Sequence, residues 1–505
     1  LARRLQISRP DARILYIAFN KSVAVEAVAR MPANVEARTG HSLAWAQVGE
    51  DFWGKTPYGK KMLGSRDQEL AAKAKYLRAR PAAVGKALGV SRSAAEVIIT
   101  AVGHFANSAD ERLDLAHIEQ VCRGGDFSKG QILHLLRVAR QYWEDIATPL
   151  SDPGQRLFQA SQDHLRKLWA LSGPDFTIPG SGAKVPAQIL FLDEAQDTPP
   201  VLARVVDQQV DMQQVLVGDR QQAIYGFAGS VDYLSGVAID TELALTTSYR
   251  FGPGIEGVAN RFLTALGATE QVTGYAENDV VGRVENPDAV LTRTNAGMLD
   301  EIVAEAEKGR RVGLLSTSRQ DLDGLVQTTA YLRDGAEKPR QWHPVLSRYD
   351  SWGEVQAEAR QATASTELQV AVRIVDAWPL RRLAAIVADS VEVVDAARTA
   401  CDVVVVTAHK AKGLEWDSVR IGSDFYGPHR APPKASKTKY DDPEHLRLDY
   451  VAVTRAKKAL DLGSLRWIQT YRPGADVQIS PLSDAGAMSC EEVDDLLLSL
   501  VGGKK

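Results

Sequence analysis

The stretch Phe191-Leu192-Asp193-Glu194-Ala195-Gln196-Asp197 says most about the fold of this chain. An apolar run that ends in adjacent carboxylates predicts a buried strand with both acids at its carboxyl end, where nucleotide-binding α/β sheets hold their chemistry. There, Asp193 would bind Mg²⁺ through oxygen contacts, and Glu194 would orient or deprotonate the water that attacks a nucleoside triphosphate. A plain polar strand edge is the alternative interpretation of this pair taken alone.

The composition points to a protein of several domains. With 505 residues, of which 45% are hydrophobic and 25% charged, the chain is too long for one ordinary core. Its 60 basic and 64 acidic residues give a net charge of −4, so any contact with DNA must be local and not a bulk electrostatic coat.

Cysteine usage and hydropathy indicate the cellular compartment of the protein. The cysteines are widely separated, which argues against a disulfide framework or a zinc site; they are Cys122, Cys401 and Cys490. No apolar stretch approaches the roughly 20 residues that a membrane span needs. We therefore expect no membrane partner and a reducing cytoplasm, with a place at the nucleoid if the source is bacterial.

Further motifs follow the acidic pair in a fixed order. They are Val217-Gly218-Asp219-Arg220-Gln221-Gln222-Ala223-Ile224-Tyr225-Gly226-Phe227, Ser248-Tyr249-Arg250, Thr407-Ala408-His409-Lys410-Ala411-Lys412-Gly413-Leu414-Glu415-Trp416 and Tyr450-Val451-Ala452-Val453-Thr454-Arg455-Ala456. Together they resemble the superfamily 1A helicases, the UvrD/Rep-like group, and especially the branch that includes the F-box DNA helicases. The resemblance covers about residues 1 to 465 and implies an α/β fold of two RecA-like parallel-sheet motor domains, each with a mainly helical insertion, that use ATP and Mg²⁺.

The resemblance also implies roles in hydrolysis. Gln222 matches a glutamine that senses the γ-phosphate and the attacking water, beside Asp193 as the metal-binding acid and Glu194 as the base. Arg250 and Arg455 would be the cations on the γ-phosphate, because the charge on the transferred group demands donors from different elements. Arg455 matches an arginine finger, which reaches nucleotide only when the two cores approach.

The nucleotide's base and sugar have candidates of their own. Tyr249 offers an aromatic face for adenine, although a buried core tyrosine is an open alternative at this position. By resemblance, Glu415 bonds the ribose, and Gly413 of the same motif belongs to the nucleotide-binding residues.

Two early motifs are candidates for the DNA path. Phe19-Asn20-Lys21 follows a predicted strand and resembles a motif in which an apolar ring, an amide and a cation meet single-stranded DNA. Thr39-Gly40-His41-Ser42 resembles the next such motif, with Gly40 where an aromatic residue is usual. That departure removes a stacking surface, while Thr39 and His41 stay candidates for contacts with DNA.

Later aromatic and basic residues add to this path. Tyr225 and Phe227 lie two residues apart, which in an extended segment puts both rings on one side, as base stacking requires. Core packing is the alternative for Phe227, and Ala228 stands where an arginine is common. Arg293 and His409 are further candidates for contacts with DNA phosphates.

Short apolar runs predict two parallel sheets. The first would contain the strands Ile14 to Phe19, Ile189 to Asp193, Val215 to Gly218 and Leu243 to Thr247. The second would contain the strands Val290 to Arg293, Val403 to Thr407, Val419 to Ser423 and Leu460 to Leu465. Helical patterns occupy the stretches between them, at Asp67 to Arg80, Ala94 to Phe105, Ile132 to Ile146, Glu367 to Trp378 and Leu380 to Val394.

These patterns predict a division of the chain. The first core comprises residues 1–45 and 185–247, with a helical insertion at 46–184. The second core comprises residues 248–295 and 401–472, with a compact accessory insertion at 296–400. The tail at 473–505 is expected to form a surface helix, with protein-partner binding as the alternative.

One expected part is missing. No Gly-x-x-x-x-Gly-Lys-Ser/Thr loop occurs in the sequence, and in this family it would precede the helix that begins near Leu1. Either the chain is a fragment that lacks its phosphate-binding loop, which the retention of the other ATP-site residues favours, or it is a pseudo-ATPase. We expect poor ATP binding, because such a loop supplies several charge-assisted bonds of roughly 1.5 to 3 kcal/mol each.

The sequence therefore predicts an ATP-dependent helicase or translocase that moves 3′ to 5′ on single-stranded DNA or at single/double-strand junctions. A non-enzymatic DNA-binding or scaffold protein on a degenerate helicase fold is the alternative. A helicase-nuclease fusion ranks lower, because only about 40 residues follow the last predicted strand.

Overall fold

The computed structural model describes most of the chain: residues 1–53, 81–123, 127–149, 157–179, 184–226, 232–343, 345–360, 366–393, 400–427 and 443–471. The helix predicted at 67–80, Phe227, Cys490 and the tail lie outside these residues. Cys122 and Cys401 are free thiols. The chain divides into two compact units, the first ending at Asp240 and the second beginning at Thr241.

The first unit is built on four parallel strands in the order β2-β1-β5-β6. They are β1 (Ile14–Ala18), β2 (Val35–Thr39), β5 (Ile189–Leu192) and β6 (Gln213–Leu216). Every residue of β1 and β5 is buried, which is typical of parallel strands covered on both faces. Leu15 and Ile17 enter one hydrophobic cluster, while Ile14 and Tyr16 enter another, as alternation along a strand requires.

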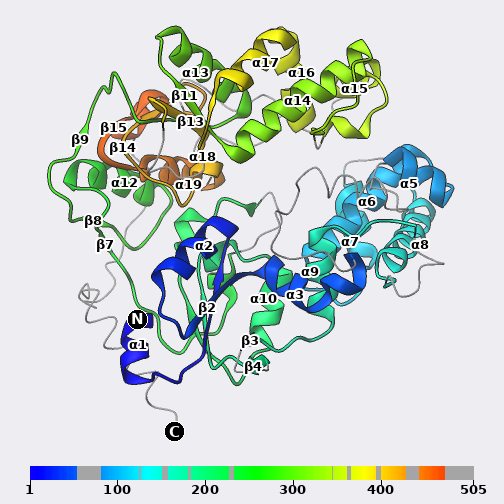
Figure 1. Ribbon diagram of the computed structural model, residues 1–505, viewed down its shortest axis with the longest axis horizontal. Helices are drawn as coiled ribbons and strands as arrows, with labels where there is room; N and C mark the ends of the chain where they lie inside the picture. Colours follow the sequence, from blue (N-terminus) through cyan, green and yellow to red (C-terminus); the bar gives the residue numbers. More distant parts are fainter. Residues whose placement is uncertain are drawn as a thin grey trace. The chain divides into compact units, whose positions relative to one another are not determined.

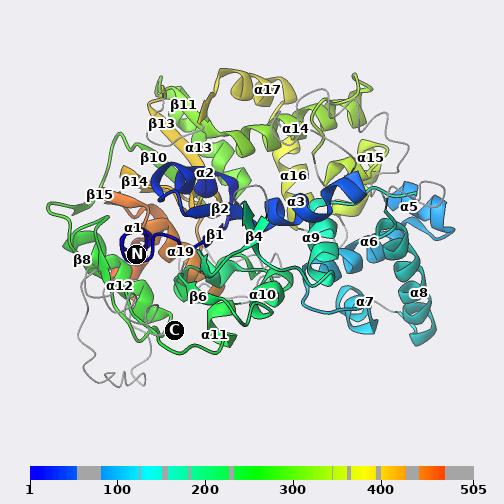
Figure 2. The same ribbon diagram turned by 60° about the horizontal axis from the view of Figure 1, so that its bottom comes forward.

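Helices surround this sheet and extend away from it (Figure 1). They are α1 (Ala2–Ser8), α2 (Lys21–Arg30), α3 (Gly40–Trp53), α5 (Pro81–Leu88), α6 (Arg92–Asn107), α7 (Leu115–Cys122), α8 (Lys129–Ile146), α9 (Gln162–Leu171), α10 (Pro200–Asp207) and α11 (Tyr233–Gly236). Figures 1 and 2 show α5 to α8 gathered together, beyond α3 and α9. This group has its own hydrophobic cluster, which includes Phe105, Tyr142 and Phe158, and it contains the helices predicted at 94–105 and 132–146.

Two strand predictions for this unit need correction. Leu243 to Thr247 does not join the sheet: only Thr247–Ser248 (β7) is extended, and it pairs with Thr273–Gly274 (β8). Leu245 is 60% exposed, so this apolar side chain does not pack into a core as a buried strand would require. The strand predicted at 215–218 lies two residues earlier, as β6.

The second unit holds a sheet of seven parallel strands in the order β12-β11-β13-β10-β14-β15-β9. They are β9 (Val280–Val281), β10 (Ala289–Thr292), β11 (Val312–Leu315), β12 (Val391–Val393), β13 (Val403–Thr407), β14 (Trp416–Ile421) and β15 (Ala456–Asp461). The predicted α/β class with two parallel sheets is therefore confirmed.

Here too the structure differs from the elements predicted from the sequence. The helix predicted at Leu380 to Val394 ends at Asp389, and β12 follows it. The strand predicted at Leu460 to Leu465 ends at Asp461, because a 3₁₀ helix occupies Gly463–Gln469. Sequence reasoning missed β11 and β12, so residues 296–400 supply two strands of this sheet besides helices.

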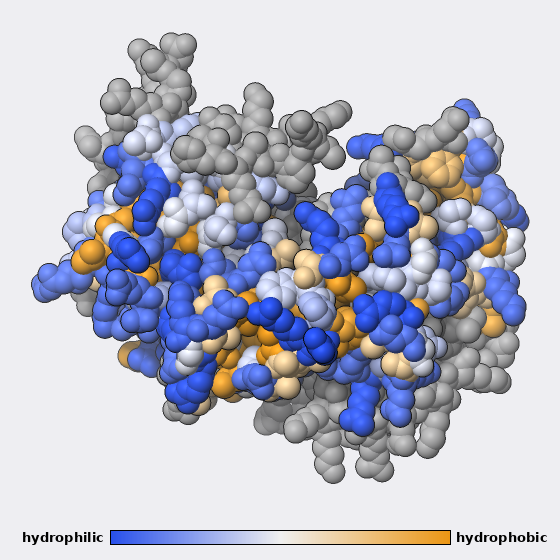
Figure 3. Space-filling model, turned by 90° about the horizontal axis from the view of Figure 1, so that it is seen from above, coloured by the Kyte–Doolittle hydropathy of each residue, from blue (hydrophilic) through white to orange (hydrophobic). Residues whose placement is uncertain are grey.

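The helices of the second unit are α12 (Pro253–Ala265), α13 (Asn295–Glu307), α14 (Ser316–Asp334), α15 (Trp352–Ala359), α16 (Thr366–Ala377), α17 (Leu380–Asp389), α18 (Ala408–Ala411) and α19 (Pro443–Val453). One hydrophobic cluster joins strands β10, β11 and β13 to helices α13 to α17. Hydrophilic residues predominate on the face drawn in Figure 3, with hydrophobic residues between them. Within the described part of the chain, no helix has both the length and the apolar character needed to cross a bilayer.

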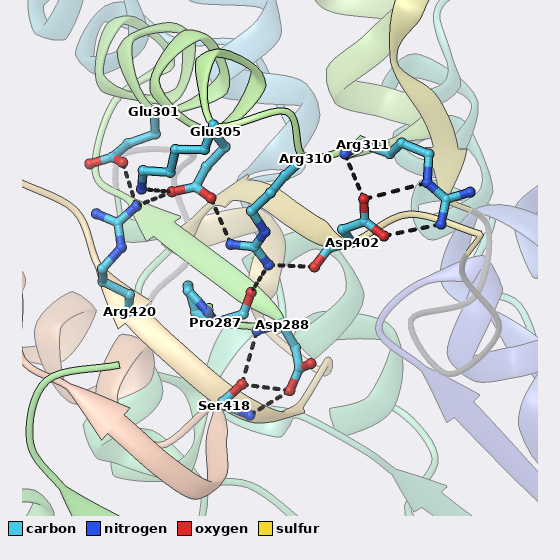
Figure 4. A network of polar contacts seen from close by, with 10 residues as sticks. Pro287, Asp288, Glu301, Glu305, Arg310, Arg311, Asp402, Ser418 and Arg420 are labelled. Atoms are coloured by element: carbon cyan, nitrogen blue, oxygen red, sulfur yellow. Dashed lines mark hydrogen bonds and ion pairs between the residues drawn. The ribbon is translucent and has the colours of Figure 1, made fainter. Parts of the chain in front are cut away.

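A polar network fixes α13 against the second sheet (Figure 4). The Glu305 side chain is 0% exposed and accepts hydrogen bonds from Lys308, Arg310 and Arg420 at 2.7, 2.6 and 2.8 Å. Burial alone would raise the pKa of Glu305, but the bonds from Lys308 and Arg310 bring it below its ordinary value. A buried carboxylate that is satisfied in this way is costly to lose.

Replacing this carboxylate should destabilise the protein. Glu305→Gln leaves the partly buried guanidinium of Arg310 without its carboxylate partner, while Arg420 keeps Glu301 at 2.8 Å, and we expect the free energy of unfolding to fall by about 3 kcal/mol near neutral pH. The pKa of Glu305 is depressed in the folded state, so its contribution is present above the unfolded-state pKa and is lost as the pH falls through the folded value. Urea denaturation at several pH values measures both effects.

Glu307 on the same helix provides the control. Its carboxylate pairs with Arg382 at 3.1 Å and is 68% exposed, so Glu307→Gln should cost less than about 1 kcal/mol. Equal effects of the two substitutions would contradict this account of the network.

Candidate active site and nucleic-acid interface

The acidic pair lies where the sequence predicts it, directly after β5. The Tyr16 hydroxyl donates a hydrogen bond to Oδ2 of Asp193, and the backbone N–H of Glu194 donates to Oδ1 of Asp193 at 3.1 Å. Burial and the hydrogen bond to Asp193 raise the pKa of Tyr16, so this phenol stays a donor. Glu194 has φ +51°, a left-handed conformation that is uncommon for residues other than glycine and is typical of functional sites.

Gln196 connects the acidic pair to the next strand end. Its side-chain NH₂ donates to Oε2 of Glu194 at 2.6 Å, and its carbonyl oxygen accepts the N–H of Asp219 at 3.1 Å. The side chain is 1% exposed. A Cβ at Gly218 would lie 2.1 Å from the same carbonyl oxygen, so this approach requires glycine. Sequence reasoning assigned no role to Gln196, although an amide between acids can both donate and accept.

Gln222 joins the same edge through Asp219. Its amide donates to Oδ2 of Asp219 at 2.7 Å, and Oδ1 of Asp219 accepts the N–H of Gln221 at 2.8 Å. A short 3₁₀ turn, Arg220–Gln222, carries these residues. The chain of hydrogen bonds therefore runs from Glu194 through Gln196 and Asp219 to Gln222.

A cavity of about 610 Å³ lies beside Asp193. Tyr16 and Asp193 line one part of it, and three arginines line another: Arg3, Arg4 and Arg30. Apolar side chains of β5 and β6 complete the wall, including Phe191 and Val215. The cavity thus combines one carboxylate with several cations, a combination suited to phosphate groups and a divalent metal ion.

In the second unit, Arg250 and Glu415 form an ion pair. Nε of Arg250 lies 2.7 Å from Oε2 of Glu415, and its Nη1 donates to the Thr454 carbonyl oxygen at 3.1 Å. Burial would raise the pKa of Glu415, but the hydrogen bond and charge of Arg250, with Lys457 and Arg455, lower it. Glu415 is therefore ionised at neutral pH.

Arg455 lies beside this pair but is buried, with 2% exposed. Its guanidinium donates to the carbonyl oxygen of Val451 at 2.9 Å and to Oγ1 of Thr454 at 3.0 Å. These bonds fix Arg455 within the protein, so its role on a phosphate stays a prediction. Gly413 has φ +80° in the turn that leads into β14, a conformation that favours glycine.

Tyr249 is 59% exposed, which does not fit the alternative of a buried core tyrosine. Its ring contacts Tyr275, with centroids 5.1 Å apart and an interplanar angle of 57°. Arg250 follows Tyr249 directly in the sequence, so one segment carries both the exposed ring and the arginine of the ion pair.

Phe19 and Tyr225 come together in the first unit. Their ring centroids lie 5.2 Å apart with an interplanar angle of 28°, and Phe19 is 39% exposed. Burial and the charges of Asp197 and Glu194 raise the pKa of Tyr225. An aromatic surface made by Tyr225 and Phe19 therefore lies near the acidic pair. Phe227, the predicted partner of Tyr225, lies outside the described residues.

The polar members of the two early motifs have structural contacts. Asn20 is the N-cap of α2 and accepts the N–H of Val23 at 3.0 Å, while Lys21 is exposed. Thr39 exchanges hydrogen bonds with Ser42 at the start of α3, and His41 lies 3.2 Å from Asp163.

Leu202 explains why an aromatic side chain is absent from position 40. A Cβ at Gly40 would lie 3.0 Å from Cδ2 of Leu202, which leaves little room for any larger side chain there. The change from the family pattern thus has a steric cause in this chain.

Arg293 and His409 lie in a partly buried cluster of the second unit. The guanidinium of Arg293 stacks 4.2 Å from the centre of the Tyr426 ring. Burial and then the charge of Arg293 lower the pKa of His409 to about 4, so this imidazole is neutral at neutral pH. Burial raises the pKa of Asp449 to about 8. A contact of His409 with a DNA phosphate stays a prediction, and a neutral imidazole would make it as a hydrogen-bond donor.

The hydrogen bonds that Gln196 makes with Glu194 and Asp219 should contribute measurably to the free energy of unfolding. Gln196→Leu keeps the volume but leaves the part-buried N–H of Asp219 without its acceptor, so we expect a loss of about 1 kcal/mol in the free energy of unfolding. Gln208→Leu, at the exposed C-cap of α10, should change the free energy of unfolding by less than about 0.5 kcal/mol. If both variants unfold alike, Gln196 does not hold the strand ends together.

Comparison with known proteins agrees with this arrangement. Residues 183–233 match the UvrD/REP helicase N-terminal domain, and residues 306–465 match the UvrD-like helicase C-terminal domain. F-box DNA helicase protein 1 of Schizosaccharomyces pombe is 27% identical over 496 residues, which cover 90% of this chain and 53% of that protein. F-box DNA helicase 1 of Gallus gallus is 27% identical over 490 residues, which cover 89% of this chain and 44% of that protein.

The chain spans about half the length of these relatives. The N-terminal family match includes Asp193, Glu194 and Gln222, while the C-terminal match includes Glu415 and Arg455. Both matches occur in the order that the motifs predict, and together with the two relatives they support a UvrD-like helicase of superfamily 1.

Proposed function

We propose that this chain is the motor region of an ATP- and Mg²⁺-dependent DNA helicase or translocase that moves 3′ to 5′ on single-stranded DNA. The observation that carries the proposal is the hydrogen-bonded row at the first sheet's edge, where Glu194, Gln196 and Gln222 are linked through Asp219. Such a row holds a base and a sensor residue at fixed positions, which phosphoryl transfer needs because positioning and charge stabilisation supply most of its catalysis.

The carboxylate of Asp193 suits Mg²⁺ that is bound together with nucleotide phosphates. Protein sites often bind Mg²⁺ through one or two carboxylates, with phosphates and water completing the shell. Asp193 offers one carboxylate in the cavity. Bound Mg²⁺ would neutralise phosphate charge, while Glu194 takes a proton from the attacking water.

The second unit, considered by itself, carries groups that suit the base, the ribose and the phosphates of a nucleotide. Tyr249 presents an aromatic face for the base, Glu415 presents an ionised carboxylate for ribose hydroxyls, and Arg250 presents a guanidinium for phosphate. Because Arg250 and Glu415 hold each other at 2.7 Å, both groups are already ordered before a ligand binds.

The stacked rings of Phe19 and Tyr225 offer the first unit's contact with DNA. Aromatic stacking accepts any base, so this surface fits a motor that moves along a strand without reading its sequence. Its place near Glu194 provides a physical route by which strand contact could influence hydrolysis.

A non-enzymatic DNA-binding protein is the second candidate. One observation favours it: these 505 residues contain no Gly-x-x-x-x-Gly-Lys-Ser/Thr sequence. We expect low ATP affinity for the polypeptide by itself, because that loop is the usual cradle of the phosphates.

ATP turnover with and without single-stranded DNA decides between these candidates. DNA-stimulated hydrolysis that falls at least 100-fold in Glu194→Gln supports the motor, because general-base catalysis contributes about 10² to 10⁴-fold. Glu119→Gln serves as the control, since that glutamate is exposed on α7, in the helical group outside the sheet. DNA binding without any turnover at saturating ATP would contradict hydrolysis by these 505 residues, and tailed duplexes would test the 3′ to 5′ polarity.

The aromatic surface predicts a separate effect on DNA binding. Phe19→Ala should weaken binding of a single-stranded oligonucleotide about tenfold, because base stacking contributes roughly 1 to 3 kcal/mol. Phe127 is a matched control, since both phenylalanines are 39% exposed. An unchanged affinity for Phe19→Ala in fluorescence anisotropy, or an equal loss for Phe127→Ala, would contradict the assignment.

A further inference from the structure

A two-strand ladder in the second unit places a second tyrosine beside Tyr249. Strand β7 pairs in parallel with β8, with Ser248 opposite Gly274. The residues that follow these two are Tyr249 and Tyr275, and the N–H of Tyr275 donates to the Ser248 carbonyl oxygen at 2.8 Å. The two rings meet because of this register, although 25 residues separate them in the sequence.

The backbone around the ladder is firmly fixed. The Asp279 carboxylate accepts the N–H groups of Gly252, Gly254 and Ile255 at 3.1, 2.8 and 2.6 Å, at the start of α12. A Cβ at Gly274 would lie 2.6 Å from the Gly252 carbonyl oxygen. Close backbone packing therefore sets the position of Tyr275 relative to Tyr249.

Neither ring is buried by this contact. Tyr249 is 59% exposed and Tyr275 is 70% exposed, among the largest exposed fractions of any aromatic residue in the described structure. Aromatic rings usually stabilise a structure by burying apolar area. Both rings here keep much of their area in water, so a planar ligand could bury it on binding.

The charged groups on the segment that carries Tyr249, and their partner, indicate the chemical class of that ligand. Arg250, adjacent in sequence to Tyr249, contacts the ionised Glu415 at 2.7 Å. An aromatic surface, a carboxylate and a guanidinium together match the base, the sugar hydroxyls and the phosphates of a nucleotide.

We propose that Tyr275 is a specificity-determining residue of the nucleotide site, where its ring, tilted by 57° from that of Tyr249, adds a second aromatic contact, so that a two-ring purine base contacts both tyrosines. The inference rests on the proposed function of this site. A one-ring pyrimidine is too small to cover both rings, so Tyr275 favours purine over pyrimidine nucleotides.

Nucleotide binding by the full chain tests this role. ATP, CTP and base-free ribose 5′-triphosphate are titrated to millimolar concentration against the wild type, Tyr275→Ala and Tyr275→Phe. We expect Tyr275→Ala to weaken ATP about tenfold, CTP less than threefold and ribose triphosphate not at all, while Tyr275→Phe keeps ATP within twofold. Tyr331→Ala is the matched control, because Tyr331 is also partly exposed and contacts Trp342 with centroids 5.4 Å apart.

The outcomes separate this role from the proposed function. An unchanged ATP affinity in Tyr275→Ala, with a loss in Tyr249→Ala, overturns the role of Tyr275 and leaves the nucleotide site standing. An equal loss for ATP and ribose triphosphate also overturns it, because the effect would then be on backbone structure. If wild-type protein binds none of the three ligands, the proposed function and this inference fall together.

Discussion

The parallel register of β1, β5 and β6 is the constraint on which the first unit's site depends. Ile17 pairs with Leu192, and Leu192 pairs with Leu216. Parallel strands in matching register end at one edge of the sheet, so the residues just beyond them meet there. Phe19 and Asp193 reach this edge from two segments of the chain that are about 170 residues apart. A shift by one residue would turn these side chains to the opposite face.

Hydrogen bonds then fix the side chains that lie at this edge of the first sheet. Strand ends alone place Asp193 and Asp219 near each other, but their side chains could still adopt many rotamers. Gln196 removes that freedom for Glu194, because it donates to the carboxylate and accepts from the N–H of Asp219 while buried. The cost of leaving that N–H unsatisfied, about 1 to 3 kcal/mol, makes the arrangement specific.

The sequence predicts those features that depend on neighbouring residues. The runs at 14–18 and 189–192 are uniformly apolar and short, so they were recognisable as buried strands. Val391–Val393 pairs with β11 but contains a glutamate and follows a helical pattern, which hid it. Gln196 and Tyr275 were missed because their roles come from partners distant in the sequence, and the ladder that places Tyr275 is only two residues long in each strand.

The ion pair of the second unit is compatible with exchange for a ligand. Its side chains are 29% and 45% exposed, and a pair this accessible contributes at most about 1 kcal/mol. A charge-assisted hydrogen bond from Arg250 to a phosphate contributes roughly 1.5 to 3 kcal/mol, so a phosphate can displace Glu415 from the guanidinium. The freed carboxylate would then accept from a hydroxyl group close by. In this unit the same contact that orders Arg250 and Glu415 before binding is thus weak enough to give way when a nucleotide arrives.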